Sequence, residues 1–144
     1  MSNGVTIVLN GIPRGKARPR FRMGRPRPFT PKETREAEFD LGWAARAAMA
    51  GHPMFAGAVV LDACFTMPIP ASWSERKRCA ALRGDVQPTT KPDADNFLKL
   101  ALDGLNKIVW KDDSQVTRAT VRKRYGALPG TVIVVRSAEP GAPA

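Results

Sequence analysis

The sequence predicts an α+β domain: a small mixed β-sheet with helices packed mainly on one of its faces. Alternating apolar residues at several places predict strands. Two segments that begin with capping signals, and a third with an apolar stripe, predict helices. The chain has 144 residues and 43% hydrophobic content, which is enough for one core. We expect a single domain over residues 1–137 and a disordered tail over residues 138–144.

The first element expected is a strand over residues 5–10. There Val5, Ile7 and Leu9 alternate with more polar neighbours, so one face of the strand is apolar. The stretch that follows, residues 12–29, is rich in proline and glycine and cannot form a regular helix. We expect an extended, mobile basic loop there.

A helix is expected next, because Thr-Pro-Lys-Glu at residues 30–33 is typical of a capping box. Thr30 is the expected N-cap and Glu33 the residue that reaches back to it. The helix should run to about Ala50 and end at Gly51 and Pro53. Its expected buried face comprises Ala37, Leu41, Ala44, Ala45 and Ala48.

The second half of the chain continues with the same signals. They predict a strand over residues 58–67, followed by a short basic helix that starts at a capping box at residues 72–75 and runs to about Leu82. A further helix is predicted over residues 93–110. Two strands, over residues 116–125 and 131–136, are joined by Gly-Ala-Leu-Pro-Gly. The expected apolar stripe of the helix over residues 93–110 comprises Phe97, Leu98, Ala101, Leu102 and Leu105.

Positive charge is unevenly distributed along the chain. The formal net charge is +10, and residues 14–32 hold eight basic residues and no acidic one. Six of these eight are arginines, which suit bidentate phosphate contacts. This favours binding of a nucleic-acid backbone, with a solvated run that only aids solubility as the alternative. The expected DNA contacts are Arg14, Lys16, Arg18, Arg20, Arg22, Arg25, Arg27, Lys32, Arg76, Lys77 and Arg78.

Negative charge gathers between Asp85 and Asp113, which hold six of the thirteen acidic residues. Helix capping explains one carboxylate at the start of a helix, but this helix start has two and a lysine. A turn composition likewise explains one of the two adjacent aspartates that follow the helix. Hard divalent cations such as Mg2+ take oxygen ligands. The pattern therefore predicts a metal site, provided that the second turn folds back near the helix.

The remaining composition excludes several classes of protein. No apolar run approaches the roughly 18 residues of a membrane span, and the N-terminal residues do not resemble a secretory signal. Cys64 and Cys79 do not form a metal-type pair, and we expect both to be reduced thiols. We therefore expect a cytoplasmic protein.

Two motifs carry a resemblance to a known family. Residues 92–106, Pro-Asp-Ala-Asp-Asn-Phe-Leu-Lys and onward, and residues 109–116, Val-Trp-Lys-Asp-Asp-Ser-Gln-Val, resemble the RusA family of Holliday-junction resolvases. The basic residues 15–38 also resemble the N-terminal part of many members, so that the resemblance spans about residues 5–136. It implies a homodimeric endonuclease, encoded largely by phages and prophages in a bacterial host. It also implies that Mg2+, with Mn2+ as a substitute, supports paired nicks in four-way DNA during recombination and repair.

The resemblance also implies residue roles. The family's essential aspartates fall on Asp93, Asp95 and Asp113, as metal ligands, and its catalytic lysine falls on Lys99. Asp112 is a further candidate ligand. Two alternatives stay open: a metal-dependent nuclease for other branched DNA, such as forks or flaps, and a non-catalytic basic DNA-binding module. The second alternative leaves the clustered aspartates unexplained.

Overall fold

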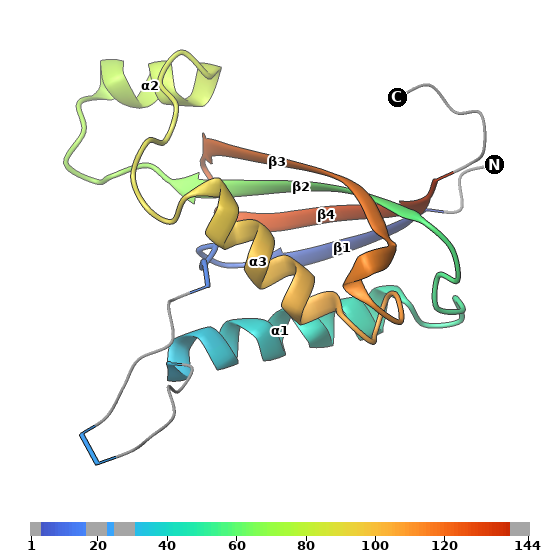
Figure 1. The fold of residues 1–144 in the computed structure, drawn as a ribbon. Coiled ribbons are helices and arrows are strands. Elements are labelled where there is room, and N and C mark those ends of the chain that lie inside the picture. The colour runs from blue at the N-terminus through green and yellow to red at the C-terminus, as the bar shows by residue number, and fades with distance from the viewer. Residues whose placement is uncertain (1–3, 17–22, 25–30, 139–144) are drawn as a thin grey trace.

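One mixed sheet of four strands, with helices against it, forms the fold (Figure 1). The structure is a computed structural model that describes residues 4–16, 23–24 and 31–138. The predicted α+β class is thus confirmed. The elements are β1 (Val5–Asn10), α1 (Lys32–Ala48), β2 (Val59–Pro68), α2 (Glu75–Arg83), α3 (Ala94–Leu105), the 3-10 turn η1 (Asp113–Gln115), β3 (Val116–Gly126) and β4 (Gly130–Ser137).

The strand order in the sheet is β1-β4-β2-β3. Strand β4 is antiparallel to both β1 and β2, whereas β3 runs parallel to β2. The last two strands are consecutive in the chain and yet are not neighbours, because β2 lies between them. This arrangement leaves β3 as an edge strand that carries the chain from η1 to the far end of the sheet.

Helices α1 and α3 cover one face of the sheet, as predicted (Figure 1). Phe65 of β2 stacks on Phe97 of α3, with ring centroids 4.3 Å apart and an interplanar angle of 7°. Leu41 of α1 packs against Gly104 of α3. The largest fully buried side chains are those of Trp110, Phe97, Ile7, Leu61, Leu105, Ile133, Val59, Val109 and Val135.

The caps of the first two helices differ from the predictions. Helix α1 begins at Lys32 with Pro31 at the N-cap, and no side-chain hydrogen bond caps it. The predicted cap, Thr30, lies outside the described residues. In α2 the cap is Ser74 rather than the first serine of the predicted box, because Ser74 Oγ accepts the hydrogen bond from Lys77 N at 3.2 Å.

Helix α3 ends five residues earlier than predicted. Asn106 is its C-cap, and Lys107 takes a left-handed conformation with φ of 66°. The chain then turns so that Trp110 forms bridges with Phe55 and Asn106 and is 0% exposed. Burial of the indole therefore ends the helix where its sequence pattern continues. On the helix itself Leu100 is buried, whereas the predicted Leu98 and Leu102 are only partly buried.

Two further expectations concern the thiols and the chain end. Cys64 and Cys79 are both free, as expected. At the predicted tail, Ala138 N donates a hydrogen bond to Ala58 O at 2.9 Å, and residues 139–144 lie outside the described part. None of the described helices is both long enough and apolar enough to cross a membrane.

The contact between α1 and α3 should be intolerant of added volume. A Cβ at Gly104 would lie 2.9 Å from Leu41 Cδ2 and 3.3 Å from Leu41 Cβ. We expect Gly104→Ala to lower the free energy of unfolding by about 1–3 kcal/mol through overpacking, although alanine is the better helix former. Gly57→Ala is the control, because no heavy atom lies within 4 Å of its added Cβ. Urea denaturation of both variants measures the difference, and equal stabilities would contradict a tight helix contact.

Candidate metal and nucleic-acid site

Asp93 stands at the N-cap of α3. Its carboxylate accepts a hydrogen bond from Asn96 N at 2.9 Å, and its side chain is exposed. A carboxylate has about four acceptor positions, so this cap occupies only a part of its capacity. Asp93 can therefore cap the helix and still present oxygen to a ligand from solvent.

Asp95 and Lys99 form an ion pair in the first two turns of the same helix. Lys99 Nζ lies 3.0 Å from Asp95 Oδ2, and the side chains are 58% and 69% exposed for Lys99 and Asp95 respectively. The partial positive charge at a helix N-terminus stabilises carboxylates placed there. The structure thus brings Asp93, Asp95 and Lys99 together at one exposed end of α3, as the sequence predicts.

Three contacts that the sequence does not reveal hold this end of α3 in place. Lys16 N donates a hydrogen bond to Asn96 O at 3.1 Å, and Gly15 packs so closely that an added Cβ would lie 2.5 Å from Pro92 Cβ. From the sheet, Lys123 Nζ donates to Thr90 O at 2.7 Å. The glycine before Lys16 is the one sequence signal for such a close approach.

Asp112 is engaged in a local turn at the start of η1. It accepts hydrogen bonds from Ser114 N and Ser114 Oγ, and these bonds lower the pKa of the carboxyl group. Gln115 completes the capping box by accepting from Asp112 N at 3.0 Å. The Gln115 amide also donates to Phe55 O at 2.8 Å and so ties the turn to the segment before β2.

Asp113 accepts a hydrogen bond from the indole of Trp110. The distance from Trp110 Nε1 to Asp113 Oδ1 is 2.8 Å, and the indole is fully buried. Buried polar groups need a partner, so Asp113 satisfies the one polar atom of the largest core side chain. Its second oxygen forms no hydrogen bond or ion pair with any other described residue.

The two groups of aspartates lie at opposite ends of α3 (Figure 1). A helix of 12 residues is about 18 Å long, and Asp93 precedes it whereas Asp113 follows it. Among the described residues, no three Asp, Glu, His or Cys side chains come together as a metal-binding group. Within one chain, the expected folding back of the second turn therefore does not occur. The loop after α3 instead packs Trp110 beside Phe55.

Several of the predicted DNA-binding residues have partners inside the protein. Lys16 pairs with Asp103 and with Glu38, the latter at 3.8 Å. The hydrogen bond to Asp103 raises the pKa of Lys16, while burial raises the pKa of Glu38. Asp103 thus forms a surface ion pair with Lys16. Lys32 pairs with Glu36 at 3.7 Å.

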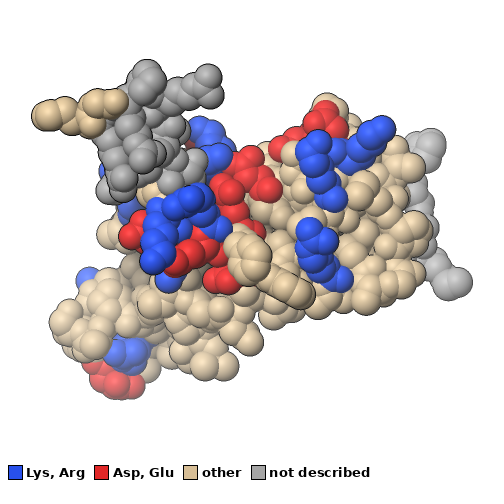
Figure 2. Space-filling view, turned by 90° about the horizontal axis from the view of Figure 1, so that it is seen from below, with Lys and Arg blue, Asp and Glu red and all other residues tan. Residues whose placement is uncertain are grey.

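The remaining predicted contacts divide between the described and undescribed parts of the chain. Lys77 lies over the Trp73 ring at 3.9 Å, next to Arg76 and Arg78 on α2. Arg14 lines a pocket beside α1. On the helix side of the molecule, basic and acidic side chains are interspersed rather than gathered in one uniform patch (Figure 2). Outside the described residues lie Arg18, Arg20, Arg22, Arg25 and Arg27.

The fold and the site are those of a basic α+β domain that carries exposed carboxylates and a lysine at the start of one helix. The family model described as Endodeoxyribonuclease RusA matches residues 10–136, so the chain belongs to the RusA family and the resemblance is confirmed. The chain is also 40% identical over 82 residues to the Uncharacterized protein YqaN of Bacillus subtilis (strain 168). That match covers 56% of this chain and 58% of YqaN, less than two thirds of its length.

The bond between Asp113 and Trp110 allows two substitutions to be separated. Asp113→Ala leaves the buried indole N–H without an acceptor, and we expect it to cost about 1–3 kcal/mol of unfolding free energy. Asp113→Asn keeps an oxygen that can accept this bond and should cost much less. Denaturant titration, followed by the fluorescence of the buried Trp110, measures both. Equal losses in the two variants would contradict the structural role of the bond.

Proposed function

We propose that this chain is a metal-dependent endodeoxyribonuclease that resolves four-way DNA junctions by paired phosphodiester nicks. The observation that carries the proposal is the exposed group of Asp93, Asp95 and Lys99 at the start of α3. Asp93 and Asp95 are one residue apart in a chain of net charge +10. Their negative charges repel a polyanion unless a cation neutralises them. Membership in the RusA family supports DNA as the substrate.

The exposed carboxylates fit a hard divalent cation. Such ions take oxygen ligands and usually keep several waters, which suits ligands that face solvent. We assign Asp93 and Asp95 to Mg2+, with Mn2+ as a substitute. A bound ion would supply charge neutralisation at the scissile phosphate and a more acidic attacking water.

Lys99 is assigned to the transition state, because an ammonium group cannot ligate a cation. It lies beside Asp95 and is more than half exposed, so its charge can face a phosphate held at the helix start. Positive charge placed where negative charge develops is worth about 10²–10³ in rate. In the resting protein the ion pair keeps the Asp95 carboxylate in position.

The third carboxylate requires a second copy of the chain. Asp113 lies beyond the other end of α3, and one chain does not bring it to Asp93 and Asp95. We therefore propose a homodimer in which Asp113, with Asp112 as its neighbour, joins the pair of the partner copy. A dimer with two-fold symmetry holds two such sites, which matches paired nicks in a junction of approximate two-fold symmetry.

The proposed DNA contacts come from basic residues around this site. In the described part they are Arg14 and the α2 residues Arg76, Lys77 and Arg78, on a helix that projects away from the sheet (Figure 1). The arginines between residues 17 and 30 complete the set. We assign the protein to recombination and repair of DNA in the cytoplasm of a bacterial host, as a phage- or prophage-type enzyme. Forks and flaps are the alternative substrates.

The metal-site proposal predicts loss of cutting without loss of folding or binding. Asparagine is nearly isosteric with aspartate and is a good N-cap, so Asp93→Asn should leave the melting temperature unchanged. Because asparagine ligates Mg2+ poorly, the same variant should lose nicking. In EDTA this variant should bind a four-way junction at least as tightly as the wild type. Asp85→Asn, an exposed aspartate paired with Arg83, is the control and should nick normally.

The substrates in that assay decide between the alternatives. Synthetic four-way, forked and linear duplex DNA are compared in Mg2+ and in EDTA. Nicking of the four-way junction alone supports a resolvase, and preferred nicking of forks points to the other branched substrates. If the wild type binds DNA tightly but nicks none of these substrates in Mg2+, the protein is a non-catalytic DNA-binding module. Full nicking activity of Asp93→Asn would show that Asp93 is not part of the site.

The shared site predicts complementation between two inactive variants. Asp93→Asn and Asp113→Asn should each be inactive alone. A mixed dimer has one site that lacks both residues and one site that retains Asp93 from one copy and Asp113 from the other. Co-refolding the two chains should therefore restore nicking of one strand per junction. No recovery in verified mixed dimers would contradict a shared site, and so would recovery with Asp93→Asn mixed with Asp95→Asn.

A further inference from the structure

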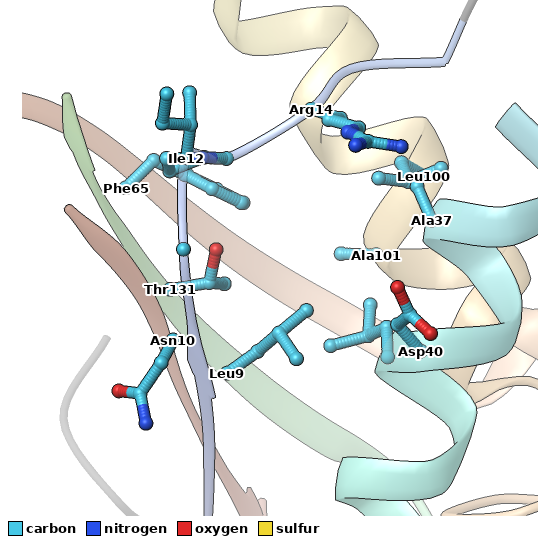
Figure 3. A pocket seen from close by; sticks show the side chains of 13 residues that line it. Leu9, Asn10, Ile12, Arg14, Ala37, Asp40, Phe65, Leu100, Ala101 and Thr131 are labelled. Atoms are coloured by element: carbon cyan, nitrogen blue, oxygen red, sulfur yellow. The ribbon is translucent and has the colours of Figure 1, made fainter. Parts of the chain in front are cut away.

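A pocket opens beside the middle of α3, between the end of β1, the segment that follows it and α1 (Figure 3). Its volume is about 150 Å³, and apolar surface makes up slightly more than half of its lining. Leu9 comes from β1, Leu41 from α1 and Phe65 from β2. Leu100 and Ala101 of α3 complete these walls. A cavity of about 150 Å³ with apolar walls can hold one six-membered aromatic ring.

One hydroxyl in the wall has no partner among the described residues. Thr131 of β4 is 5% exposed, and its side chain forms no hydrogen bond with any described residue. Asn106 Oδ1 is the one buried side-chain polar atom without a partner among the described residues, so the Thr131 hydroxyl is open to the pocket. A ligand in the pocket can therefore form a hydrogen bond with it.

Three polar side chains also line the pocket. Arg14 lies above Asp40 of α1 on the right of the view, and Asn10 points away from both at the lower left (Figure 3). None of the three side chains is engaged in an ion pair or hydrogen bond within the described part of the chain. An ionised carboxylate only accepts hydrogen bonds, whereas a guanidinium only donates. The lining of the pocket therefore offers a carboxylate, on Asp40, that can accept a hydrogen bond from an N–H group. It also offers a guanidinium, on Arg14, that can donate to a phosphate.

The pocket is adjacent to the proposed metal site. The segment that lines it runs on to Gly15 and Lys16, which contact Pro92 and Asn96 on either side of Asp93. Along α3, Leu100 follows Asp95 by five residues, a rise of about 7.5 Å. A nucleotide next to a phosphate held by the carboxylates can therefore place its base here.

We propose that this pocket binds the six-membered ring of a single nucleobase extruded at the DNA branch, and selects bases that carry an amino group on that ring. The inference rests on the proposed function, which supplies the DNA. Extrusion of a paired base costs a few kcal/mol, and it costs least where pairing is already disturbed. Asp40 accepts from the amino groups of adenine, cytosine or guanine. Thymine offers only a ring N–H between two carbonyl oxygens, which the carboxylate repels.

The test is the base preference of Asp40→Asn. Four-way junctions carry A, C, G, T or an abasic site next to the scissile phosphate, and binding to them is measured in EDTA alongside nicking in Mg2+. We expect the wild type to favour amino-bearing bases over thymine by about 10-fold, in line with the discrimination given by one base contact. In Asp40→Asn this ratio should fall below about 3-fold, because an amide both donates and accepts. Asp85→Asn should keep the wild-type ratio.

Thr131→Val separates a ligand role from a structural one. Valine has the same shape without the hydroxyl, so the variant should be at least as stable as the wild type. It should bind junctions with an intact amino base about 5-fold more weakly and the abasic junction equally well. Thr6→Val, on exposed β1 surface, is the control.

Three outcomes would overturn the inference. They are equal affinity of the wild type for all bases and the abasic site, an Asp40→Asn effect that is the same on every base, and an equal loss by Thr131→Val on intact and abasic DNA. Failure of the proposed function looks different: no DNA is nicked in Mg2+ by the wild type, while the base preference in EDTA is still measurable. The two failures are therefore distinguishable.

Discussion

The packing of α3 against the sheet and against its neighbour α1 is the constraint on which the rest of the structure depends. Phe97 stacks on Phe65 on one side, and Gly104 allows Leu41 to approach on the other. These two contacts fix the position and the direction of the helix. Its first turn then holds Asp93 and Asp95 at one end of the molecule, and its last turn directs the chain toward Trp110 at the other. The separation of the acidic residues is thus a consequence of core packing.

The elements of the fold were predictable from the sequence because their periodicity is strong. All four strands appear where the apolar pattern places them, and the three helices appear where the capping signals and the apolar stripe place them. Element ends were less predictable. Helix α3 stops at Leu105 although its sequence remains compatible with a helix, because burying Trp110 beside Phe55 outweighs another turn of local hydrogen bonds. Likewise Ser74 rather than Ser72 caps α2, and both serines fit the local signal.

The candidate site was predictable only in its local half. Asp93, Asp95 and Lys99 are close in sequence, so helical spacing alone brings them together. Where Asp113 lies depends on a loop whose course is set by long-range contacts, among them the bonds of Gln115 to the segment before β2. The pairing of Lys16 with Asp103 spans 87 residues and has no local signal. The pocket at Thr131 is lined by residues of five separate elements and has no local signal in the sequence either.

Structural and functional roles are compatible in these aspartates because each uses only part of its hydrogen-bonding capacity. Asp93 accepts one backbone N–H, and Asp113 accepts one indole N–H. Asp95 balances its charge against Lys99. These partners, together with the positive end of α3, reduce the repulsion between neighbouring carboxylates before any cation binds. Asp93 and Asp95 can therefore stay exposed at the helix start without destabilising it. Exposed carboxylates can bind a cation from solvent.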